Sequence, residues 1–118
     1  TPPILPPRAV PATQSALSLF RNVPRPDAIF AANDVMAIGV MRAARETGIT
    51  IPGQLAVVGF DDIPSAGLVT PSLTTIAHFP ELIGQKAGEI LMNHLSGEQD
   101  SPGSTTEMPY RLVKRESA

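Results

Sequence analysis

The sequence contains no cysteine among its 118 residues. This absence excludes a disulfide framework, a cysteine nucleophile and a metal site with thiolate ligands. No apolar run approaches the roughly 18 residues that span a bilayer. The start, TPPILPPRAVP, also lacks the charged region and long apolar core of a signal peptide. We therefore expect a protein of a reducing compartment, the cytoplasm, with no membrane partner.

Charged residues are also scarce. They make up 17% of the chain, the formal net charge is −2, and the basic residues are scattered. Such a chain offers no basic stripe to nucleic-acid phosphates. The glycines form neither a GxGxxG nor a Walker pattern, so no nucleotide cofactor is indicated. The length and composition predict one globular domain with a modest core.

Proline, by contrast, is abundant and uneven. Seven of the 13 prolines lie in the first 26 residues. Because proline fixes φ and removes a backbone donor, residues 1–12 are predicted to form a proline-rich, extended lead-in. An edge strand over residues 4–10 is the alternative. Residues 13–118 then form the folded part.

Hydrophobic periodicity predicts alternating helices and strands. The predicted helices cover residues 13–22, 34–47 and 80–96, and the predicted strands cover residues 28–32, 55–60, 73–77 and 110–116. Thr13 is the expected N-cap of the first helix, Asn33 or Asp34 caps the second, and Pro80 suits the first turn of the third. Helices between apolar strands indicate βαβ units. The predicted fold class is therefore α/β, with a Rossmann-like, mostly parallel sheet flanked by helices.

Two apolar strands end in acid-containing pairs, Asn33-Asp34 and Asp61-Asp62. The carboxyl ends of neighbouring parallel strands share one edge of the sheet, and open α/β sheets bind ligands there. An amide that donates and accepts, beside a carboxylate that accepts, matches adjacent hydroxyl groups of a sugar or a ribose. Phe60 and Phe30 can supply an apolar face for a ring. We expect Asn33 and Asp61 to face the ligand, and Asp34 and Asp62 to have helix-capping or structural roles.

A simpler explanation fits the same residues. Asparagine and aspartate are the best N-caps, and an acidic side chain favours a helix N-terminus. Capping alone explains Asn33-Asp34, and turn formation alone explains Asp61-Asp62. The occurrence of both pairs at equivalent strand ends favours a ligand site.

Catalytic interpretations find less support. Paired acids at strand ends can hold Mg²⁺, but such sites usually add a lysine at a later strand end, and the nearest is Lys86, inside a predicted helix. Ser65 and His78 lack a nucleophile-elbow pattern. His94 lies on a helix stripe, where a packed or surface histidine is commoner than a ligand. We expect no catalytic residue, no metal and no cofactor, and hence a protein that is not an enzyme.

Three segments resemble a known family. FAANDVMAIG, VVGFDDIP and PSLTTI occur in this order between Pro26 and Ile76, and a weaker similarity continues to LVKRES near the end of the chain. They resemble the effector-binding domain of LacI/GalR-type bacterial transcription regulators. The resemblance implies a periplasmic-binding-protein-like fold, in which a sugar or nucleobase effector binds between two Rossmann-like lobes.

The resemblance also implies roles for particular residues. In this family, effector binding reorients the lobes and changes the affinity of an attached helix-turn-helix dimer for operator DNA. Asn33, Asp61 and Phe60 match the positions expected to contact the effector. The helix over residues 80–96 is expected to belong to the other lobe, with residues 77–79 as a hinge strand.

Much of such a regulator lies outside this sequence. No helix-turn-helix or N-terminal lobe is recognisable, and the proline-rich start matches nothing in the family pattern. We therefore expect residues 13–118 to be the C-terminal part of an effector-binding domain. Its helix over residues 80–96 then exposes an apolar stripe, which favours a homodimer. The alternatives are a solute-binding module of a transport or chemoreceptor system, and a Mg²⁺-dependent enzyme or receiver-like domain.

Overall fold

The computed structural model describes residues 9–98 and 103–118. The chain divides into two compact units. Unit 1 contains the described residues up to Ala77 together with Leu112–Ala118, and unit 2 contains the described residues of His78–Arg111. The chain therefore leaves unit 1 after Ala77 and returns to it at Leu112.

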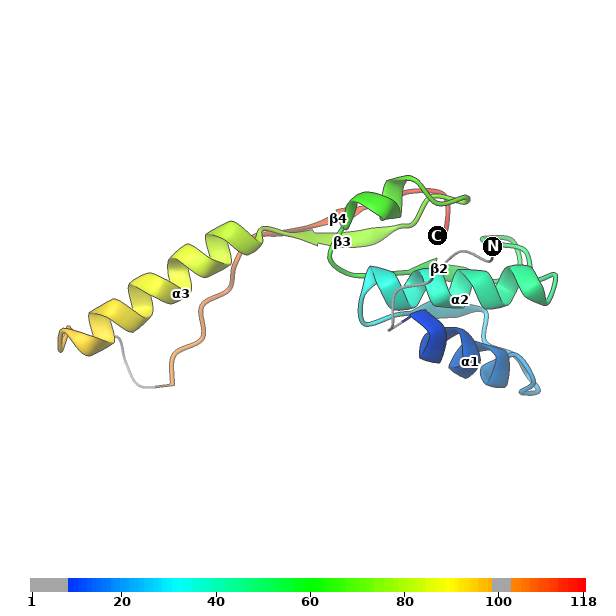
Figure 1. Cartoon of the computed structure of the whole chain (residues 1–118), viewed down its shortest axis with the longest axis horizontal. Helices are drawn as coiled ribbons and strands as arrows, with labels where there is room; N and C mark the ends of the chain where they lie inside the picture. The colour runs from blue at the N-terminus through cyan, green and yellow to red at the C-terminus, as the bar shows by residue number, and fades with distance from the viewer. Residues whose placement is uncertain (1–8, 99–102) are drawn as a thin grey trace. The chain divides into compact units, whose positions relative to one another are not determined.

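Unit 1 is built around parallel strands covered by helices (Figure 1). In chain order it contains α1 (Ala9–Leu19), β1 (Ala28–Phe30), α2 (Asp34–Glu46), β2 (Ala56–Val58), the 3-10 turn η1 (Pro64–Gly67) and most of β3 (Thr75–His78). β1 pairs with β2 in parallel. Two further parallel bridges, Val58 to Thr74 and Asp61 to Ala77, continue the pairing towards β3. The predicted α/β class with a mostly parallel sheet is confirmed.

The core of unit 1 joins α2 to the strands. The predicted apolar face of α2, spaced i, i+3, i+4 and i+7, is buried: Ala37, Val40, Met41 and Ala44. Leu55, Val57 and Leu73 are fully buried in the same cluster. Gly48 follows the helix with φ 72, the left-handed geometry that a glycine commonly adopts just after a helix.

The first helix begins earlier than predicted. α1 starts at Ala9, so the extended lead-in predicted for residues 1–12 is wrong for residues 9–12. Residues 1–8 lie outside the described residues. Pro11 is compatible with the helix because it occupies the first turn, where a backbone N–H has no intrahelical partner.

The prediction that Thr13 caps this helix is also wrong. Thr13 lies inside α1 and is buried. Its hydroxyl oxygen is 2.9 Å from the carbonyl oxygen of Ala9 and 3.0 Å from that of Gly39. A threonine hydroxyl can donate to a carbonyl one turn earlier, which suits a helix interior as well as a cap. Here the same hydroxyl also meets a carbonyl of α2, so Thr13 links the two helices.

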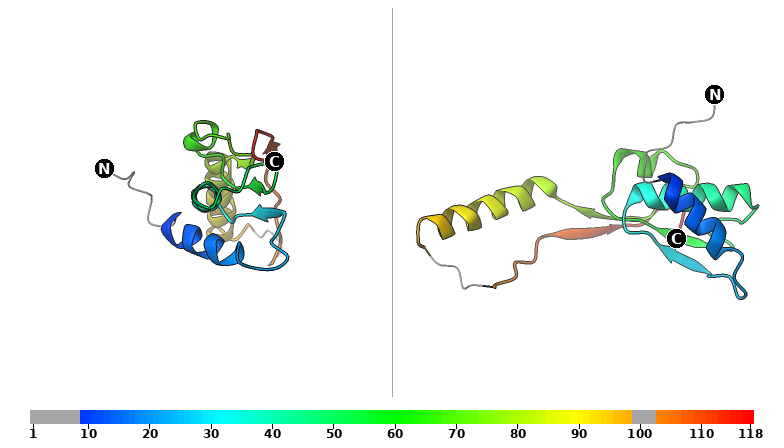
Figure 2. Two further views of the ribbon diagram at one scale, coloured as in Figure 1. Left: turned by 90° about the vertical axis from the view of Figure 1, so that its right-hand side faces the viewer. Right: turned by 60° about the horizontal axis from the view of Figure 1, so that its bottom comes forward.

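Small residues let α1 and α2 lie side by side (Figure 2). Ala9, Ala12 and Ala16 are buried on α1, and Gly39 faces the first two from α2. A Cβ atom on Gly39 would lie 2.5 Å from the carbonyl oxygen of Ala9 and 3.0 Å from the Cβ of Ala12. The helix contact therefore leaves no room for a side chain at position 39.

Gly39→Ala should destabilise unit 1. The new methyl group would force α1 away from α2, and overpacking of this kind costs about 1–3 kcal/mol. Gly84→Ala in α3 is the matched control, because nothing lies within 4 Å of its new methyl group, and replacing a helical glycine gains about 0.5–1 kcal/mol. Urea unfolding followed by circular dichroism distinguishes the two. An unchanged midpoint for Gly39→Ala would contradict the close helix contact.

The last residues of the chain are built into unit 1. Ser117 is fully buried, and its hydroxyl donates to the Val57 carbonyl at 2.6 Å and accepts from the Thr74 N–H at 2.8 Å. Its backbone N–H donates to the Ser72 carbonyl, and its carbonyl accepts from the Val57 N–H, both at 2.9 Å. Glu116 accepts hydrogen bonds from the Ser72 N–H and hydroxyl at 2.8 and 3.1 Å.

Because of these bonds, the contribution of Glu116 to the stability of unit 1 depends on pH. The backbone N–H of Ser72 and then its hydroxyl lower the pKa of Glu116 below the ordinary value of 4.5. Because the folded value is depressed, the stabilisation by Glu116 should be full above about pH 4.5 and lost as the pH falls through the folded pKa. In an NMR titration, Ser72→Ala should raise the pKa of Glu116 part of the way back, whereas Ser104→Ala should leave it unchanged. An unaltered Glu116 titration in Ser72→Ala would refute this assignment.

Unit 2 contains α3 (Pro80–Leu95) and the first half of β4 (Tyr110–Val113), which pairs with β3. Pro80 occupies the first turn, as predicted, and no residue of α3 is buried. The predicted apolar stripe is at the surface, and Leu91 is 57% exposed. β4 is shorter than the predicted strand over residues 110–116, because the Arg115 N–H donates to the Thr74 hydroxyl at 2.8 Å.

No helix in the described part of the chain has the length and hydropathy needed to cross a bilayer.

Candidate functional site

The predicted site residues follow two paired strands of unit 1. Asn33 and Asp34 come after β1, and Phe60 and Asp61 come after its partner β2. The Asp34 N–H donates to the Phe60 carbonyl at 2.8 Å, so the two strand ends are directly joined. Asp61 is in turn joined to the next strand, because its N–H donates to the Ile76 carbonyl at 2.9 Å.

Asn33 caps α2, as the simpler explanation requires. Its backbone is extended, with φ −155 and ψ 169, and its Oδ1 accepts from the Met36 N–H at 2.9 Å. Within the described residues this is the side chain's one hydrogen bond, so the amide NH₂ group is an unused donor. Capping and ligand binding are therefore compatible, because they use different atoms of the same side chain.

Asp34 is the structural centre of the two strand ends. It is fully buried. Its Oδ1 accepts from the Thr75 hydroxyl at 2.5 Å and its Oδ2 accepts from the Ile63 N–H at 2.9 Å. A Cβ atom on Gly59 would collide with Oδ1 of Asp34. The glycine in the GFDD stretch is therefore required for the approach of α2 to the end of β2.

Asp61 and Asp62 share an unusual backbone. Their φ angles are 115 and 52, in the region that favours glycine. Asp61 is exposed, whereas Asp62 is half-buried and its Oδ1 lies 2.8 Å from Nη2 of Arg115. Non-glycine residues in this region often mark functional sites. The two acids thus differ in exposure, and the side chain of Asp62 is turned towards Arg115.

Sequence reasoning missed three contributors to this site: Gly59, Thr75 and Arg115. Gly59 and Thr75 lie within the predicted strands over residues 55–60 and 73–77, and nothing local in the sequence marks either as part of a site. Arg115 lies in the LVKRES stretch that carried the weaker family resemblance. That stretch was the available signal, but a lone arginine 53 positions from Asp62 gives no indication of its partner.

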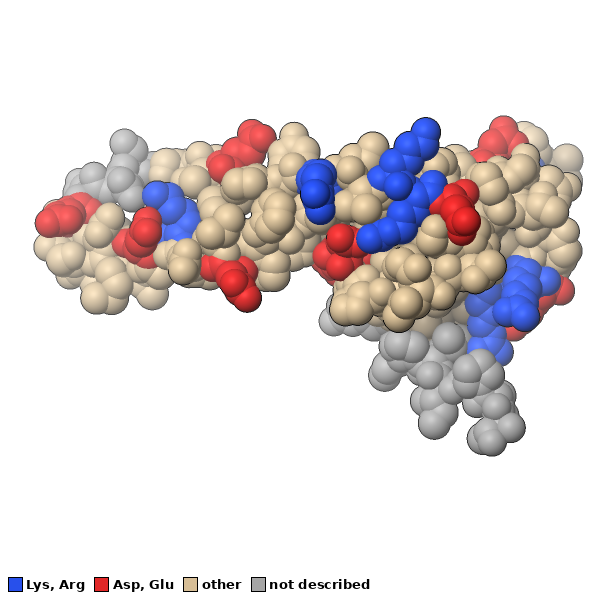
Figure 3. All heavy atoms as spheres, turned by 90° about the horizontal axis from the view of Figure 1, so that it is seen from above, with Lys and Arg blue, Asp and Glu red and all other residues tan. Residues whose placement is uncertain are grey.

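The residues considered for catalysis lie in separate elements of the described chain. No group of three His, Asp or Glu side chains in the described ranges could hold a metal ion. Lys86, on the exposed surface of α3, lies 3.4 Å from Glu89. Ser65 is in η1, and His78 ends β3. On the face drawn in Figure 3, acidic and basic side chains are interspersed, and the described residues form no basic stripe there.

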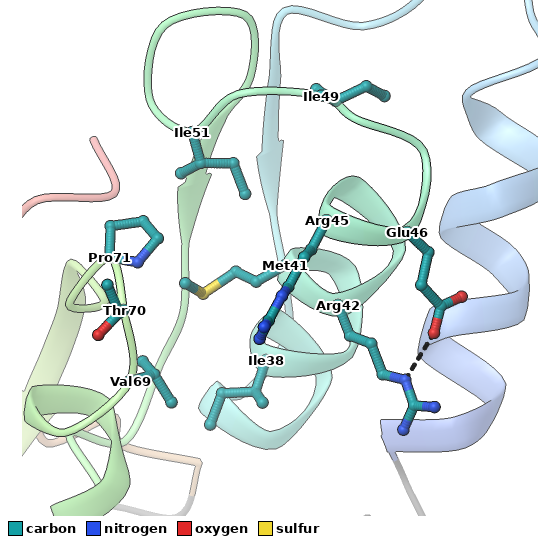
Figure 4. A pocket seen from close by; sticks show the side chains of 10 residues that line it. All are labelled: Ile38, Met41, Arg42, Arg45, Glu46, Ile49, Ile51, Val69, Thr70 and Pro71. Carbon is teal, nitrogen blue, oxygen red and sulfur yellow. Dashed lines mark hydrogen bonds and ion pairs between the residues drawn. The ribbon is translucent and has the colours of Figure 1, made fainter. Parts of the chain in front are cut away.

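Two hollows of unit 1 lie near the elements described above. The larger, about 940 Å³, lies beside α2 (Figure 4), and an Arg42–Glu46 ion pair of 2.8 Å lies at it. None of the predicted site residues lines it. The smaller, about 650 Å³, lies between α1 and β1 and is mainly apolar, and its lining includes Asn33 and the 64% exposed Phe30. Size alone therefore does not indicate the ligand site, and the smaller hollow is the one next to a predicted contact.

The chain is similar to known transcription regulators over most of its length. Residues 5–118 match the periplasmic binding protein-like domain. The chain is 48% identical over 105 residues to the lactose operon repressor of Rhizobium radiobacter, covering 89% of this chain and 91% of that protein. The chain belongs to the LacI-type family of regulators. It is also 39% identical over 93 residues to the transcriptional repressor PurR of Proteus mirabilis, covering 79% of this chain and 27% of that protein.

Solved structures of LacI-type regulators agree with the fold. The LacI family regulator of Arthrobacter sp. FB24, in complex with lactose, is 40% identical with a TM-score of 0.77, over 92% of this chain and 41% of that one. The lac repressor dimer bound to operator is 33% identical with a TM-score of 0.80, over 92% of this chain and 37% of that one. This LacI-type chain thus spans about two-fifths of those solved chains and about a quarter of PurR.

Asp34→Asn should destabilise unit 1 strongly. The new amide would place its NH₂ group, a donor, against another donor, either the Ile63 N–H or the Thr75 hydroxyl. Position 34 is fully buried. The loss of a hydrogen bond to a charged group, with a donor left unsatisfied, costs about 2–3 kcal/mol. The exposed Asp27→Asn is the control and should change stability by less than about 0.5 kcal/mol. Equal urea midpoints for the two variants would refute the central position of Asp34.

Proposed function

We propose that this chain forms part of the effector-binding domain of a LacI-type transcription regulator and contributes Asn33, Phe60 and Asp61 to a pocket for a small neutral effector. The observation that carries the proposal is the hydrogen bond from the Asp34 N–H to the Phe60 carbonyl. It brings the loops that hold Asn33 and Asp61 together at one edge of the sheet, where open α/β sheets bind ligands.

The chemistry of these residues suits a sugar. The unused NH₂ group of Asn33 donates, and the carboxylate of Asp61 accepts, so the pair complements two hydroxyl groups. The carboxylates of Asp61 and Asp34 place negative charge at this edge, which disfavours an anionic ligand. The ring of Phe60 would cover an apolar face of the ligand. A neutral polyol fits this set better than a phosphate or a carboxylate.

The relatives favour a sugar over a nucleobase. The Arthrobacter regulator was solved with lactose, a Lactobacillus casei regulator with sucrose, and the regulator CelR with cellobiose, and their identities to this chain are 40%, 28% and 31%. All three ligands are neutral disaccharides. Lactose is the first probe, because the chain is also 48% identical to a lactose operon repressor.

The proposed mechanism is a shift between arrangements of the two lobes. An effector that binds one arrangement more tightly favours it, and the differential affinity typically supplies 1–3 kcal/mol of coupling. Operator DNA would be bound by a helix-turn-helix outside this sequence, in a homodimer such as the lac repressor dimer. The role is regulatory rather than enzymatic, and cytoplasmic. A solute-binding role in transport is not favoured, because the named relatives are repressors.

Saturation-transfer NMR with lactose tests the proposal on the 118-residue chain, since it detects weak binding. Asn33→Ser keeps a capping oxygen but removes the NH₂ donor, and Asp61→Asn removes the charge. Each should weaken lactose binding about tenfold, the effect of losing one hydrogen bond of about 1.4 kcal/mol. The matched controls, Asn22→Ser and Asp27→Asn, alter exposed residues and should have no effect. Absence of transfer from lactose, sucrose and cellobiose to the wild-type chain would overturn the proposed site.

A further inference from the structure

The conformation of the Asp61–Asp62 loop needs an external support. Two consecutive non-glycine residues have positive φ there, and such a backbone persists only where its surroundings hold it. The Asp61 N–H is held by the Ile76 carbonyl at 2.9 Å. The Asp62 N–H has only a long contact, 3.4 Å, with the Thr75 hydroxyl. The side chain of Asp62 therefore makes a closer contact than its backbone N–H does.

The partner of the Asp62 side chain is Arg115. Its Nη2 lies 2.8 Å from Oδ1 of Asp62, and its Nη1 donates to the Leu73 carbonyl at 3.0 Å. The side chains of Arg115 and Asp62 are each 23% exposed, so water screens the pair only in part. The guanidinium group also lies against η1, because a Cβ atom on Gly67 would be 3.9 Å from Nε. One planar group thus contacts the site loop, the turn that follows it and the residues before β3.

Arg115 itself is fixed at its backbone. Its N–H donates to the Thr74 hydroxyl at 2.8 Å, and Ser117, two residues later, is fully buried. Arg115 lies in Leu112–Ala118, the segment that re-enters unit 1 after unit 2. The support of the site loop therefore comes from the segment of unit 1 that follows unit 2 in the chain.

We propose that Arg115 is a positioning residue for the effector site: it holds the Asp61–Asp62 loop in its left-handed conformation and couples that loop to the segment returning from unit 2. This proposal rests on the proposed function, in which Asp61 contacts the effector. Arg115 acts through Asp62 and does not itself touch the ligand. A change in the returning segment would then change the placement of Asp61, and an effector bound at Asp61 would in turn stabilise the position of the segment.

Lysine should not replace Arg115. The guanidinium fork satisfies Asp62 and the Leu73 carbonyl with separate nitrogens in one plane, whereas an ammonium group on a flexible stem is a single point charge. Arg115→Lys therefore keeps the charge and removes the geometry. Asp62→Asn removes the negative charge of the pair and leaves the shape of the side chain almost unchanged. If the two residues act as one pair, the double variant should be no worse than either single variant.

Amide hydrogen exchange on the 118-residue chain tests the positioning role without a ligand. In Arg115→Lys and in Asp62→Asn, exchange at the Asp61 N–H should become about tenfold faster, as expected for the loss of a hydrogen bond to a charged group. The Ala31 N–H, bonded to the Val58 carbonyl at 2.8 Å between β1 and β2, should keep its wild-type rate. Lys114→Met, at the exposed neighbouring position, is the control and should leave both rates unchanged.

Lactose binding, followed by saturation transfer, is the second readout, and it should weaken in Arg115→Lys. Unchanged exchange at Asp61 in Arg115→Lys would overturn the proposal. Equal acceleration at Ala31 would also overturn it, because the effect would then be global unfolding. If the wild-type chain binds none of the sugars, the proposed function fails, and exchange at Asp61 still decides whether Arg115 positions the loop.

Discussion

The geometry of unit 1 depends on one buried carboxylate. Asp34 begins α2, donates its N–H to the Phe60 carbonyl, and accepts from the Ile63 N–H and the Thr75 hydroxyl. A buried carboxylate is tolerated only where donors satisfy its oxygens, and here each oxygen has one. The N-terminus of α2 adds a favourable dipole. A single residue thereby joins the ends of β1 and β2 to the first residue of β3, beside the proposed effector pocket.

The neighbouring residues follow from this arrangement. The carboxylate lies so close to the end of β2 that position 59 must be glycine, and the chain then turns sharply through the positive φ angles of Asp61 and Asp62. The turn exposes Asp61 and leaves Asp62 against Arg115. Asn33 precedes Asp34 and needs only one oxygen for capping. The groups proposed to face the ligand thus lie beside a structural core, which explains why both the capping and the binding interpretation fitted these residues.

The parts of unit 1 that follow from periodicity and local chemistry could be predicted. The spacing of Ala37, Val40 and Met41, the cap at Asn33 and the glycine at 48 are all local signals, and the structure contains each of them. The start of α1 was not predictable from proline content, because a proline in a first turn costs the helix no hydrogen bond. The partners of Thr13 and Arg115 were missed for a different reason. They lie 26 and 53 positions away in the chain, and nothing local in the sequence indicates them.

The burial of Ser117 has a consequence for the order of folding during synthesis. Its hydroxyl meets the Thr74 N–H across 43 positions, and its backbone and hydroxyl satisfy both polar groups of Val57 across 60. Until the ribosome has released residues 115–117, the backbone of Val57 and Thr74 in the middle of unit 1 has no partner for these groups. Unit 1 therefore cannot complete its core while unit 2 is still being made. The residues of unit 2 must therefore be synthesised before unit 1 can be finished.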